Sequence, residues 1–352
     1  MKKNKLGKTD IMVSEICLGS MTWGQQNSEQ EAHEQLSFAI EKGINFIDTA
    51  EMYAVPPKKE TYGLTETYIG TWLLNQDRSK IILATKLAGR TSNMPSGPPG
   101  LNWIRNGPRL NKNHIFEALH GSLKRLNTDY IDVYQLHWPE RNVNNFGQLG
   151  YTHSPREDDI KIEVTLEALS EAVNKGLIRH IGLSNESPWG VMKFLAAAEK
   201  FNLPRIVTIQ NPYSLLNRSF EVGLSEISIN EDVGLLPYSP LAGGVLTGKY
   251  LNGNKPENAR MTLFERMGTR YSSKHAENAV LEYQKIAQKH NLNLTQMAIN
   301  FVTKQNFVTS NIIGATSLKQ LEENIDSVNC NLSEEVMEEI NTVHQIFTYP
   351  CP

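Results

Sequence analysis

Short runs of β-branched and other apolar residues alternate along the whole chain with longer stretches whose apolar residues recur at helical spacing. Leu64, Tyr68 and Trp72 are spaced four residues apart, as on one face of a helix. By contrast, residues 81–84 are continuously apolar, which is typical of a parallel strand buried on both faces. The predicted strands are Ile16 to Gly19, Ile44 to Asp48, Ile81 to Lys86, Tyr130 to His137, Ile178 to Ser184, Ile206 to Gln210, Gly234 to Tyr238 and Asn311 to Gly314.

Eight strands, each followed by a helix or a long loop, predict an α/β fold of the (β/α)8 TIM-barrel type. The alternative is an open doubly wound sheet, which normally carries a glycine-rich G-x-G-x-x-G turn after its first strand. Here the first predicted strand runs into residues 19–24, GSMTWG, which lack that spacing. The barrel is therefore the preferred fold.

Additional elements and two long connections decorate the predicted barrel. Residues 3–13 are expected to form an N-terminal β-hairpin with its turn at residues 7–10. Ser333, followed by Glu334 and Glu335, is a typical N-cap for an extra helix. The connections at 87–111 and 138–160 are unusually long, and such loops are usually functional or disordered. No repeat or linker divides the sequence, so we expect one domain over residues 1–352.

The composition is that of an ordinary soluble globular protein, with 39% hydrophobic and 21% charged residues. A net charge of −3 provides no general attraction to nucleic acid or membrane, so an anionic ligand would need a local cluster of basic groups. No apolar run approaches the roughly 20 residues of a membrane-spanning helix, and no signal peptide is recognisable. Cys17, Cys330 and Cys351 lack metal-ligand spacing and are expected to be reduced thiols. These features predict a cytoplasmic protein that binds neither nucleic acid nor membrane.

Titratable side chains stand at the predicted C-terminal ends of consecutive strands. Asp48 ends the second strand, Lys86 the third and His137 the fourth, and Tyr53 lies five residues beyond Asp48. The C-terminal strand ends of a parallel barrel converge on one face, where barrel enzymes have their active sites. Each residue alone has an ordinary explanation as a helix cap or a solvated charge. Their joint placement predicts a catalytic cluster.

This set of side chains is suited to giving a proton to an oxygen atom. A tyrosine hydroxyl has an ordinary pKa near ~10, and a nearby Lys86 ammonium is expected to lower the Tyr53 pKa toward the operating range. Asp48 keeps the lysine charged, and a neutral His137 can hydrogen-bond a carbonyl oxygen and hold it against the tyrosine. No side chain supplies hydride, so the cluster implies a nicotinamide cofactor and a small-molecule carbonyl substrate.

The residues around this cluster resemble signatures of the aldo-keto reductase superfamily. Segments 43–53 (GINFIDTAEMY) and 135–139 (QLHWP) carry the resemblance, which extends over essentially the whole length. The family's catalytic tetrad is Asp, Tyr, Lys and His, and the matching positions here are Asp48, Tyr53, Lys86 and His137. Segments 209–218 and 246–250 are similar to the branch related to potassium-channel β-subunits. The resemblance implies an NADP(H)-dependent enzyme that reduces aldehyde or ketone carbonyls to alcohols, with Tyr53 as general acid.

Polar residues after the later strands are expected to bind the cofactor. The resemblance assigns Ser184, Asn185 and Gln210 to the nicotinamide carboxamide. Tyr238, at the end of the seventh predicted strand, could stack on the nicotinamide ring. The resemblance implies further cofactor positions at the ends of the first two predicted strands and in the loop after Tyr238. They are Ser20, Met21, Asp48, Ser239, Pro240, Leu241 and Gly243.

The loop after the seventh strand resembles a phosphate-binding loop. Gly243, Gly248 and Lys249 nearly complete the P-loop pattern, but Tyr250 stands where a magnesium-binding Ser or Thr is required. The loop also follows the seventh strand instead of opening the sheet, so nucleotide hydrolysis is rejected. Lys249 and Arg260 instead match positions that contact the 2′-phosphate in the channel-subunit branch. They favour NADP(H) over NAD(H).

The chain after the eighth strand leads into a helix, whose free N–H groups favour a bound anion. In the family pattern, Gly314, Thr316 and Gln320 contact the adenosine phosphates, while Glu323 and Asn324 hold the adenine. Gln320 and Asn324 are four residues apart and therefore lie on one helix face.

Two other functions fit parts of the sequence. Some relatives act chiefly as NADPH-binding regulatory or scaffold subunits, but an intact tetrad, and His137 in particular, favours an enzyme. A metal-dependent barrel hydrolase needs several His and Asp ligands at strand ends, and only Asp48 and His137 stand there. We therefore expect no metal site.

The walls of a substrate pocket are expected from the loops at 21–27, 54–62, 87–111 and 138–160. The tryptophans in or beside these loops are pocket walls or packing residues, and they are Trp23, Trp103 and Trp138. Arg90, Arg105 and Arg109 hint at an anionic substrate, although a solvated loop surface explains them more simply. The channel-subunit branch includes tetramers, so a homo-oligomer is a further possibility, but no segment specifies an interface.

Overall fold

The computed structural model describes residues 1–91 and 100–352. Its main sheet contains eight parallel strands in the order β10-β3-β4-β5-β6-β7-β8-β9, so the last strand returns beside the first. The strands are β3 Ile16–Gly19, β4 Phe46–Asp48, β5 Ile82–Leu87, β6 Ile131–Leu136, β7 Ile178–Ser184, β8 Ile206–Gln210, β9 Gly234–Leu235 and β10 Asn311–Ile313.

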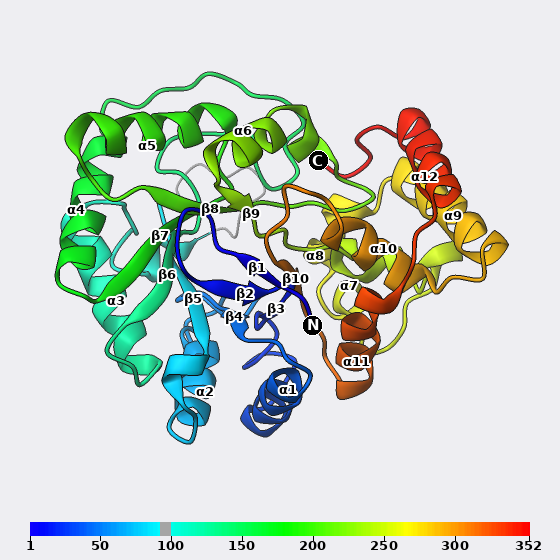
Figure 1. Cartoon of the computed structure of the whole chain (residues 1–352), viewed down its shortest axis with the longest axis horizontal. Coiled ribbons are helices and arrows are strands. Elements are labelled where there is room, and N and C mark those ends of the chain that lie inside the picture. Colours follow the sequence, from blue (N-terminus) through cyan, green and yellow to red (C-terminus); the bar gives the residue numbers. More distant parts are fainter. Residues whose placement is uncertain (92–99) are drawn as a thin grey trace.

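The sheet curls until backbone hydrogen bonds link its two ends. Leu235 of β9 donates its N–H to the Phe307 carbonyl (2.9 Å) and accepts from the Thr309 N–H (2.8 Å). Ile312 of β10 donates to the Pro237 carbonyl (2.9 Å). Figure 1 shows the strands at the centre of the molecule and the helices around them. This arrangement is consistent with the predicted (β/α)8 barrel.

The observed strand boundaries agree with the sequence prediction except at the seventh strand. The first, fifth and sixth predicted strands have the observed bounds, and four others differ by one or two residues at their ends. The seventh was predicted to reach Tyr238, but β9 ends at Leu235. Pro237 has no N–H to donate to the ladder, so regular pairing stops before it. Tyr238 still forms an isolated parallel bridge with Pro212, which keeps it at the carboxyl edge of the sheet.

Helices cover the outer side of the sheet, and several begin at a side-chain N-cap. Ser28 forms a capping box with Glu31 at the start of α1. Ser333 accepts a hydrogen bond from the Val336 N–H, as expected for the extra helix α12. The α-helices are α1 Glu29–Glu41, α2 Leu64–Leu73, α3 Lys112–Arg125, α4 Ile162–Asn174, α5 Pro188–Phe201, α6 Leu224–Glu231, α7 Arg260–Leu263, α8 Glu265–Gly268, α9 Lys274–Lys289, α10 Leu294–Thr303, α11 Leu318–Asp326 and α12 Glu334–Ile346. The 3-10 helices are η1 Arg78–Lys80, η2 Leu101–Trp103, η3 Ser219–Val222, η4 Ala242–Thr247, η5 Leu251–Gly253, η6 Thr269–Tyr271 and η7 Ser327–Asn329.

The N-terminal hairpin covers one end of the sheet interior. As predicted, β1 Lys3–Lys5 pairs antiparallel with β2 Met12–Ser14. Leu6 and Val13 of this hairpin are buried in one cluster with interior side chains such as Phe46 and Val207, which lie near the starts of their strands. The hairpin therefore closes the amino end of the sheet, and the carboxyl end is left for the site.

Two further observations bear on the sequence predictions. Among the described residues, no helix combines the length and the apolar character needed to cross a bilayer. Cys17, Cys330 and Cys351 are free thiols, and burial raises the pKa of the Cys17 thiol well above its ordinary value. A thiol with a raised pKa is a poor nucleophile, so Cys17 serves as a core side chain.

Candidate active site

The four predicted catalytic residues meet at the carboxyl end of the sheet. Lys86 Nζ lies 2.6 Å from Asp48 Oδ2 and 2.7 Å from the Thr49 carbonyl oxygen, so a buried ion pair joins β4 and β5. The ammonium is 5.1 Å from the centre of the Tyr53 ring. The rings of Tyr53 and His137 meet edge to face with their centroids 5.8 Å apart.

Amide side chains from two more strands hold the Asp48 carboxylate in place. Gln135 Nε2 of β6 and Gln210 Nε2 of β8 donate to Asp48 Oδ1 at 3.0 and 2.8 Å. Gln210 Nε2 also lies 3.1 Å from Gln135 Oε1. All three side chains are buried. The carboxylate is thus fixed from several strands at once, which restricts the position of the Lys86 ammonium as well.

Burial and charge set the protonation of Lys86 and His137. Burial is the largest single effect and lowers the pKa of Lys86, but the Asp48 carboxylate and other neighbouring groups together outweigh it and the pKa is raised, so the lysine is a cation. Burial, followed by the Lys86 charge, holds the pKa of His137 well below its ordinary value, so the imidazole is neutral at physiological pH. Within the described part of the chain, His137 Nδ1 has no hydrogen-bond partner. A neutral imidazole can donate one hydrogen bond to an incoming oxygen atom.

Tyr53 differs from the sequence-based expectation. Burial raises its pKa above the ordinary value of 10.0, and Lys86 opposes this increase only in part. The expectation that the ammonium lowers the pKa toward neutrality is therefore wrong for this structure. The physical reason is that loss of hydration disfavours the tyrosinate more than the Lys86 charge stabilises it. Tyr53 accordingly holds its proton at neutral pH.

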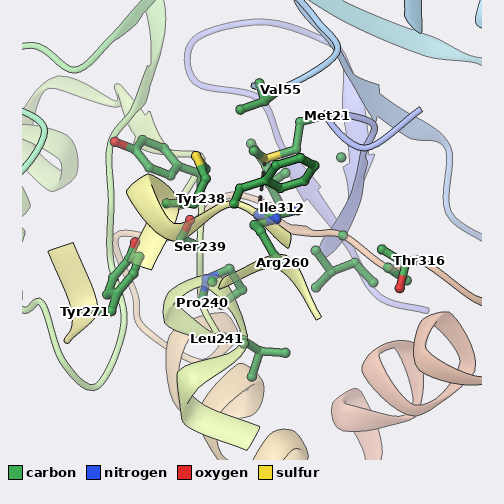
Figure 2. Close-up of a pocket in the computed structure, with 18 of the residues that line it drawn as sticks. Met21, Val55, Tyr238, Ser239, Pro240, Leu241, Arg260, Tyr271, Ile312 and Thr316 are labelled. Carbon is green, nitrogen blue, oxygen red and sulfur yellow. Dashed lines mark hydrogen bonds between the residues drawn. The ribbon is translucent and has the colours of Figure 1, made fainter. Parts of the chain in front are cut away.

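One large cavity of about 1140 Å³ lies against the tetrad. Asp48, Tyr53 and His137 line it, whereas Lys86 lies behind them. Every residue predicted to bind the cofactor also lines this cavity. Figure 2 shows Arg260 pointing into it, with Met21 next to the guanidinium. Small-ligand pockets usually have volumes of about 300–1,000 Å³, so this one has room for a ligand of dinucleotide size.

Polar groups after β7, β8 and β9 form a connected row along one wall. Asn185 Nδ2 donates to the His137 carbonyl (2.8 Å), and Ser184 Oγ donates to the Gln210 carbonyl (2.8 Å). The Tyr238 hydroxyl donates to Asn185 Oδ1 (2.7 Å). These bonds connect the expected nicotinamide residues to the tetrad and fix their orientation.

The loop after β9 turns tightly at glycines. Gly243, Gly244 and Gly248 have φ angles of 66°, 97° and 78°, which are readily adopted only by glycine. This backbone brings the loop and Lys249 to the edge of the cavity. The resulting loop can present backbone N–H groups to an anion without a side chain in the way.

Lys249 and Arg260 are cations that line the cavity and have no carboxylate partner among the described residues. Burial lowers the pKa of Lys249, and the nearby Arg260 charge lowers it further. Burial also lowers the pKa of Arg260, whose Nη1 lies 3.7 Å from Met21 Sδ. Two neighbouring cations that repel each other favour an anion between them.

The residues after β10 surround the start of α11. The Thr316 N–H and hydroxyl both donate to Gln320 Oε1, at 3.0 and 3.1 Å. Asn324 Nδ2 donates to the Gly314 carbonyl (3.1 Å). Glu323 lines the same end of the cavity. The structure therefore brings together the residues that the resemblance assigns to the adenosine.

Some walls of the cavity were not predicted from the sequence. Phe264, Met267, Arg270 and Tyr271 come from α8, η6 and the residue before α8, and Thr295 comes from the start of α10. These residues follow no strand end, and the first four belong to or adjoin helices of only three or four residues, which are too short to show a clear period. The only signal in the sequence was the apolar and aromatic content of residues 261–271.

The arginines of the loop at 87–111 do not form an anion site. Arg90, Arg105 and Arg109 each pair with a carboxylate, and none of the three lines the large cavity. The partners are Asp158, Glu51 and Glu140, respectively. Residues 92–99 of the loop lie outside the described residues. The arginines therefore do not indicate an anionic substrate, and that expectation is wrong.

The three tryptophans have different positions. Trp138 is buried and lines the cavity, with its ring centroid 4.7 Å from that of His137 and 6.2 Å from that of Phe146. Trp23 belongs to the hydrophobic core, and Trp103 packs on another ring away from the cavity. Only Trp138 of the three is a pocket wall.

A group of potential metal ligands in the described part of the chain lies on helices and not at strand ends. His290, Glu335 and Glu339 come from the end of α9 and from α12. Lys289 Nζ already pairs with both glutamates, at 2.9 and 2.5 Å. The group does not include Asp48, so it gives no support to a barrel hydrolase.

The sequence of the chain is similar to those of known proteins. The profile of the aldo/keto reductase family matches residues 15–345. The chain belongs to the aldo/keto reductase family. This aldo/keto reductase is 52% identical over 353 aligned residues to the Tas protein of Escherichia coli (strain K12), with all of both chains covered.

More distant relatives carry the same family name or a channel-subunit name. The reductase is 37% identical over 281 residues to an aldo-keto reductase of Babesia bovis, which covers 76% of this chain and 96% of the relative. It is 29% identical over 354 residues to a probable voltage-gated potassium channel subunit beta of Oryza sativa subsp. japonica, which covers 98% and 97%. The predicted family and its relation to the channel-subunit branch are confirmed.

Proposed function

We propose that this aldo/keto reductase uses NADPH to reduce an aldehyde or ketone to an alcohol, with Tyr53 as the proton donor. The observation that carries the proposal is the buried Asp48–Lys86 pair beside Tyr53, at the base of a single large cavity. A neutral His137 stands at the same place. The set offers a proton and a hydrogen bond to one oxygen atom, which suits carbonyl reduction.

The lining of the cavity fits a phosphorylated dinucleotide, which would supply the hydride when bound. Lys249 and Arg260 provide positive charge that no described carboxylate neutralises, as a 2′-phosphate requires. A Cβ built on Gly314 would meet no atom within 4 Å, so its backbone is open to the cavity. Tyr238 is placed by Asn185 on the wall expected for the nicotinamide.

The side chains divide the work of proton transfer. The substrate oxygen would lie between the Tyr53 hydroxyl and His137. As the carbonyl carbon gains hydride, the π electron pair moves onto the oxygen, which takes the Tyr53 proton and becomes the alcohol hydroxyl. The Lys86 ammonium stabilises the tyrosinate that is left, and solvent returns its proton. Asp48 keeps the ammonium in position.

The substrate end of the cavity is apolar. Met52 and Val55 follow β4, and Trp138 and Phe146 follow β6, whereas the polar cofactor residues mostly follow β7 to β10. The rings of Trp138 and Phe146 continue outward from His137. A carbonyl compound with a neutral, apolar body would bury its surface here, and a sugar would leave hydroxyl groups without partners. We therefore propose apolar aldehydes or ketones as substrates.

The proposal includes a complete (β/α)8 barrel that forms one domain over residues 1–352. The hydrogen bonds of Leu235 to Phe307 and Thr309 support closure of the sheet. The family match over residues 15–345 supports a single unit.

The direct test is Tyr53→Phe, which removes the hydroxyl and keeps the ring. NADPH binding, followed by fluorescence, should persist, while carbonyl reduction followed by NADPH absorbance should fall by about 10²–10⁴-fold. Tyr151→Phe makes the same chemical change at an exposed position and should leave turnover unchanged. Wild-type turnover in Tyr53→Phe contradicts the acid role. A wild-type protein that binds NADPH tightly but reduces no aldehyde or ketone would favour a regulatory subunit instead.

A further inference from the structure

The turn that leads to Tyr53 contains a buried carboxylate outside the tetrad, Glu51. Its Oε1 accepts a hydrogen bond from the Ala88 N–H (2.5 Å), and its Oε2 accepts from the Tyr62 hydroxyl (3.1 Å) and from Arg105. Glu51 has no exposed surface. A carboxylate buried this deeply needs such partners, because an unpaired charge in the interior is strongly unfavourable. Glu51 therefore ties three segments of the chain together.

Arg105 completes a clamp around one peptide unit after β5. Arg105 Nη2 donates to the Ala88 carbonyl (2.9 Å), while Glu51 accepts from the Ala88 N–H. Both polar groups of Ala88 are thus held by one ion pair, whose side chains are 4% and 0% exposed. Burial is the largest single effect and lowers the pKa of Arg105, but Glu51 and the neighbouring tyrosines together outweigh it and the pKa is raised, so the guanidinium stays charged.

The clamp is connected to the tetrad through the backbone. The Glu51 N–H donates to the Lys86 carbonyl (3.0 Å), and the His137 N–H donates to the Leu87 carbonyl (3.1 Å). Ala88 follows Leu87 directly, and Glu51 stands two residues before the catalytic tyrosine. A displacement of the Ala88 peptide would therefore reach the tyrosine, the lysine and the histidine.

We propose that the Glu51–Arg105 ion pair is a positioning device for the tetrad, which fixes the turn carrying Tyr53 against β5 and β6. The inference rests on the proposed reductase function, because it concerns turnover. Neither residue of the pair lines the large cavity, so the pair acts only through the residues that it holds. Catalytic groups must be held to within about 0.5 Å, and a displacement of about 1 Å can reduce the rate by about a hundredfold.

Glu51→Gln and Arg105→Met break the pair from its two sides. We expect kcat for carbonyl reduction to fall by about a hundredfold in each. NADPH binding should be unchanged, because the pair does not line the cavity and most of the expected cofactor residues follow β7 to β10. Arg105→Lys keeps the charge but lacks the forked guanidinium that contacts Glu51 and the Ala88 carbonyl through separate nitrogens. Its kcat should therefore lie between those of the wild type and of Arg105→Met. The alkaline limb of kcat against pH should move upward, because Lys86 lowers the pKa of a displaced Tyr53 less, and the acid then stays protonated to higher pH.

Asp132→Asn is the matched control at the opposite end of the sheet. Asp132 is fully buried at the start of β6 and accepts from the Leu83 N–H of β5 (2.9 Å). It pairs with Arg78 (2.7 Å) and Arg179 (2.8 Å). The variant also removes the charge of a buried, arginine-paired carboxylate that holds a β5 peptide, but at the end of the strands away from the tetrad. It should lose stability and keep the kcat and pH profile of the wild type.

The double variant Glu51→Gln/Arg105→Met separates positioning from simple destabilisation. Removing both charges leaves no unpaired charge in the interior, so stability should recover relative to the single variants. Positioning predicts that kcat stays low, because the Arg105 contact to Ala88 is still missing. Recovery of kcat together with stability, or wild-type kcat in both single variants, overturns the inference. A wild-type protein without turnover rejects the proposed function, and this inference with it.

Discussion

Lys86→Met tests the buried ion pair at the centre of the site. The variant keeps most of the side-chain length and removes an ammonium that lies 2.6 Å from Asp48 and 2.7 Å from the Thr49 carbonyl. Leaving one buried charge without its partner destabilises a protein by about 3–5 kcal/mol. Asp48 would keep its hydrogen bonds from Gln135 and Gln210 (3.0 and 2.8 Å), which places the expected loss near the lower limit, about 3 kcal/mol.

This loss converts into a modest shift of the melting temperature. The entropy of unfolding is about 2.1 cal/mol/K per residue, or about 0.7 kcal/mol/K for a chain of 352 residues. A loss of about 3 kcal/mol should therefore lower Tm by about 4 °C in calorimetry near neutral pH. Carbonyl reduction should also be lost, because the tyrosinate formed at Tyr53 would have no cation beside it.

The pH dependence of this difference has a defined sign. Lys86 has a raised pKa in the folded protein, so its stabilising contribution is present below the ordinary lysine pKa of 10.5. The contribution is lost as the pH rises through the folded value. The Tm difference between wild type and Lys86→Met should thus stay constant near neutrality and shrink in strongly alkaline solution.

A double variant provides the control for the charge argument. Asp48→Asn/Lys86→Met contains no lone buried charge and should regain part of the stability without regaining turnover. The reasoning is refuted if Lys86→Met melts at the wild-type temperature, or if the double variant is less stable than the single one. Turnover retained in Lys86→Met would remove the lysine from the proposed mechanism.

Two further variants test the cofactor and substrate proposals. Lys249→Ala/Arg260→Ala should weaken NADPH binding far more than NADH binding in fluorescence titrations, because only NADPH carries the 2′-phosphate; equal losses would reject the assignment. Phe146→Ala should lower kcat/KM for an aromatic aldehyde by roughly tenfold or more, since burial against a Phe side chain contributes about 1.5–3 kcal/mol, and should spare a two- or three-carbon aldehyde. Equal effects on both aldehydes would show that Phe146 is not a substrate wall.

The strands and the tetrad could be predicted because both depend on local pattern. A run such as residues 81–84 has the uninterrupted apolar character of a strand buried on both faces. The position of a residue at the end of such a run then fixes the face of the barrel on which it lies. The ends of their strands place Asp48, Lys86 and His137 on one face of the predicted barrel.

The features that were missed depend on contacts between distant segments. Glu51 and Arg105 are 54 residues apart, and no spacing in the sequence indicates that they meet. Phe264 and Met267 form cavity walls from short elements that have no clear period. The seventh strand was also predicted to be too long. Its apolar run continues through Pro237, which has no N–H to donate to the ladder.

The pKa of Tyr53 illustrates the same limit and bears on the direction of the reaction. Residue types alone suggest that the Lys86 ammonium lowers this pKa, but its net direction depends on how much hydration the phenol loses. In the structure burial prevails, and the hydroxyl is protonated at neutral pH. An acid that donates its proton to a forming alkoxide must begin protonated, whereas a base for alcohol oxidation must begin ionised. In the proposed reaction, the half-buried Tyr53 therefore begins protonated at neutral pH, as a proton donor for reduction requires, and Lys86 would lower the energy of the tyrosinate only as it forms.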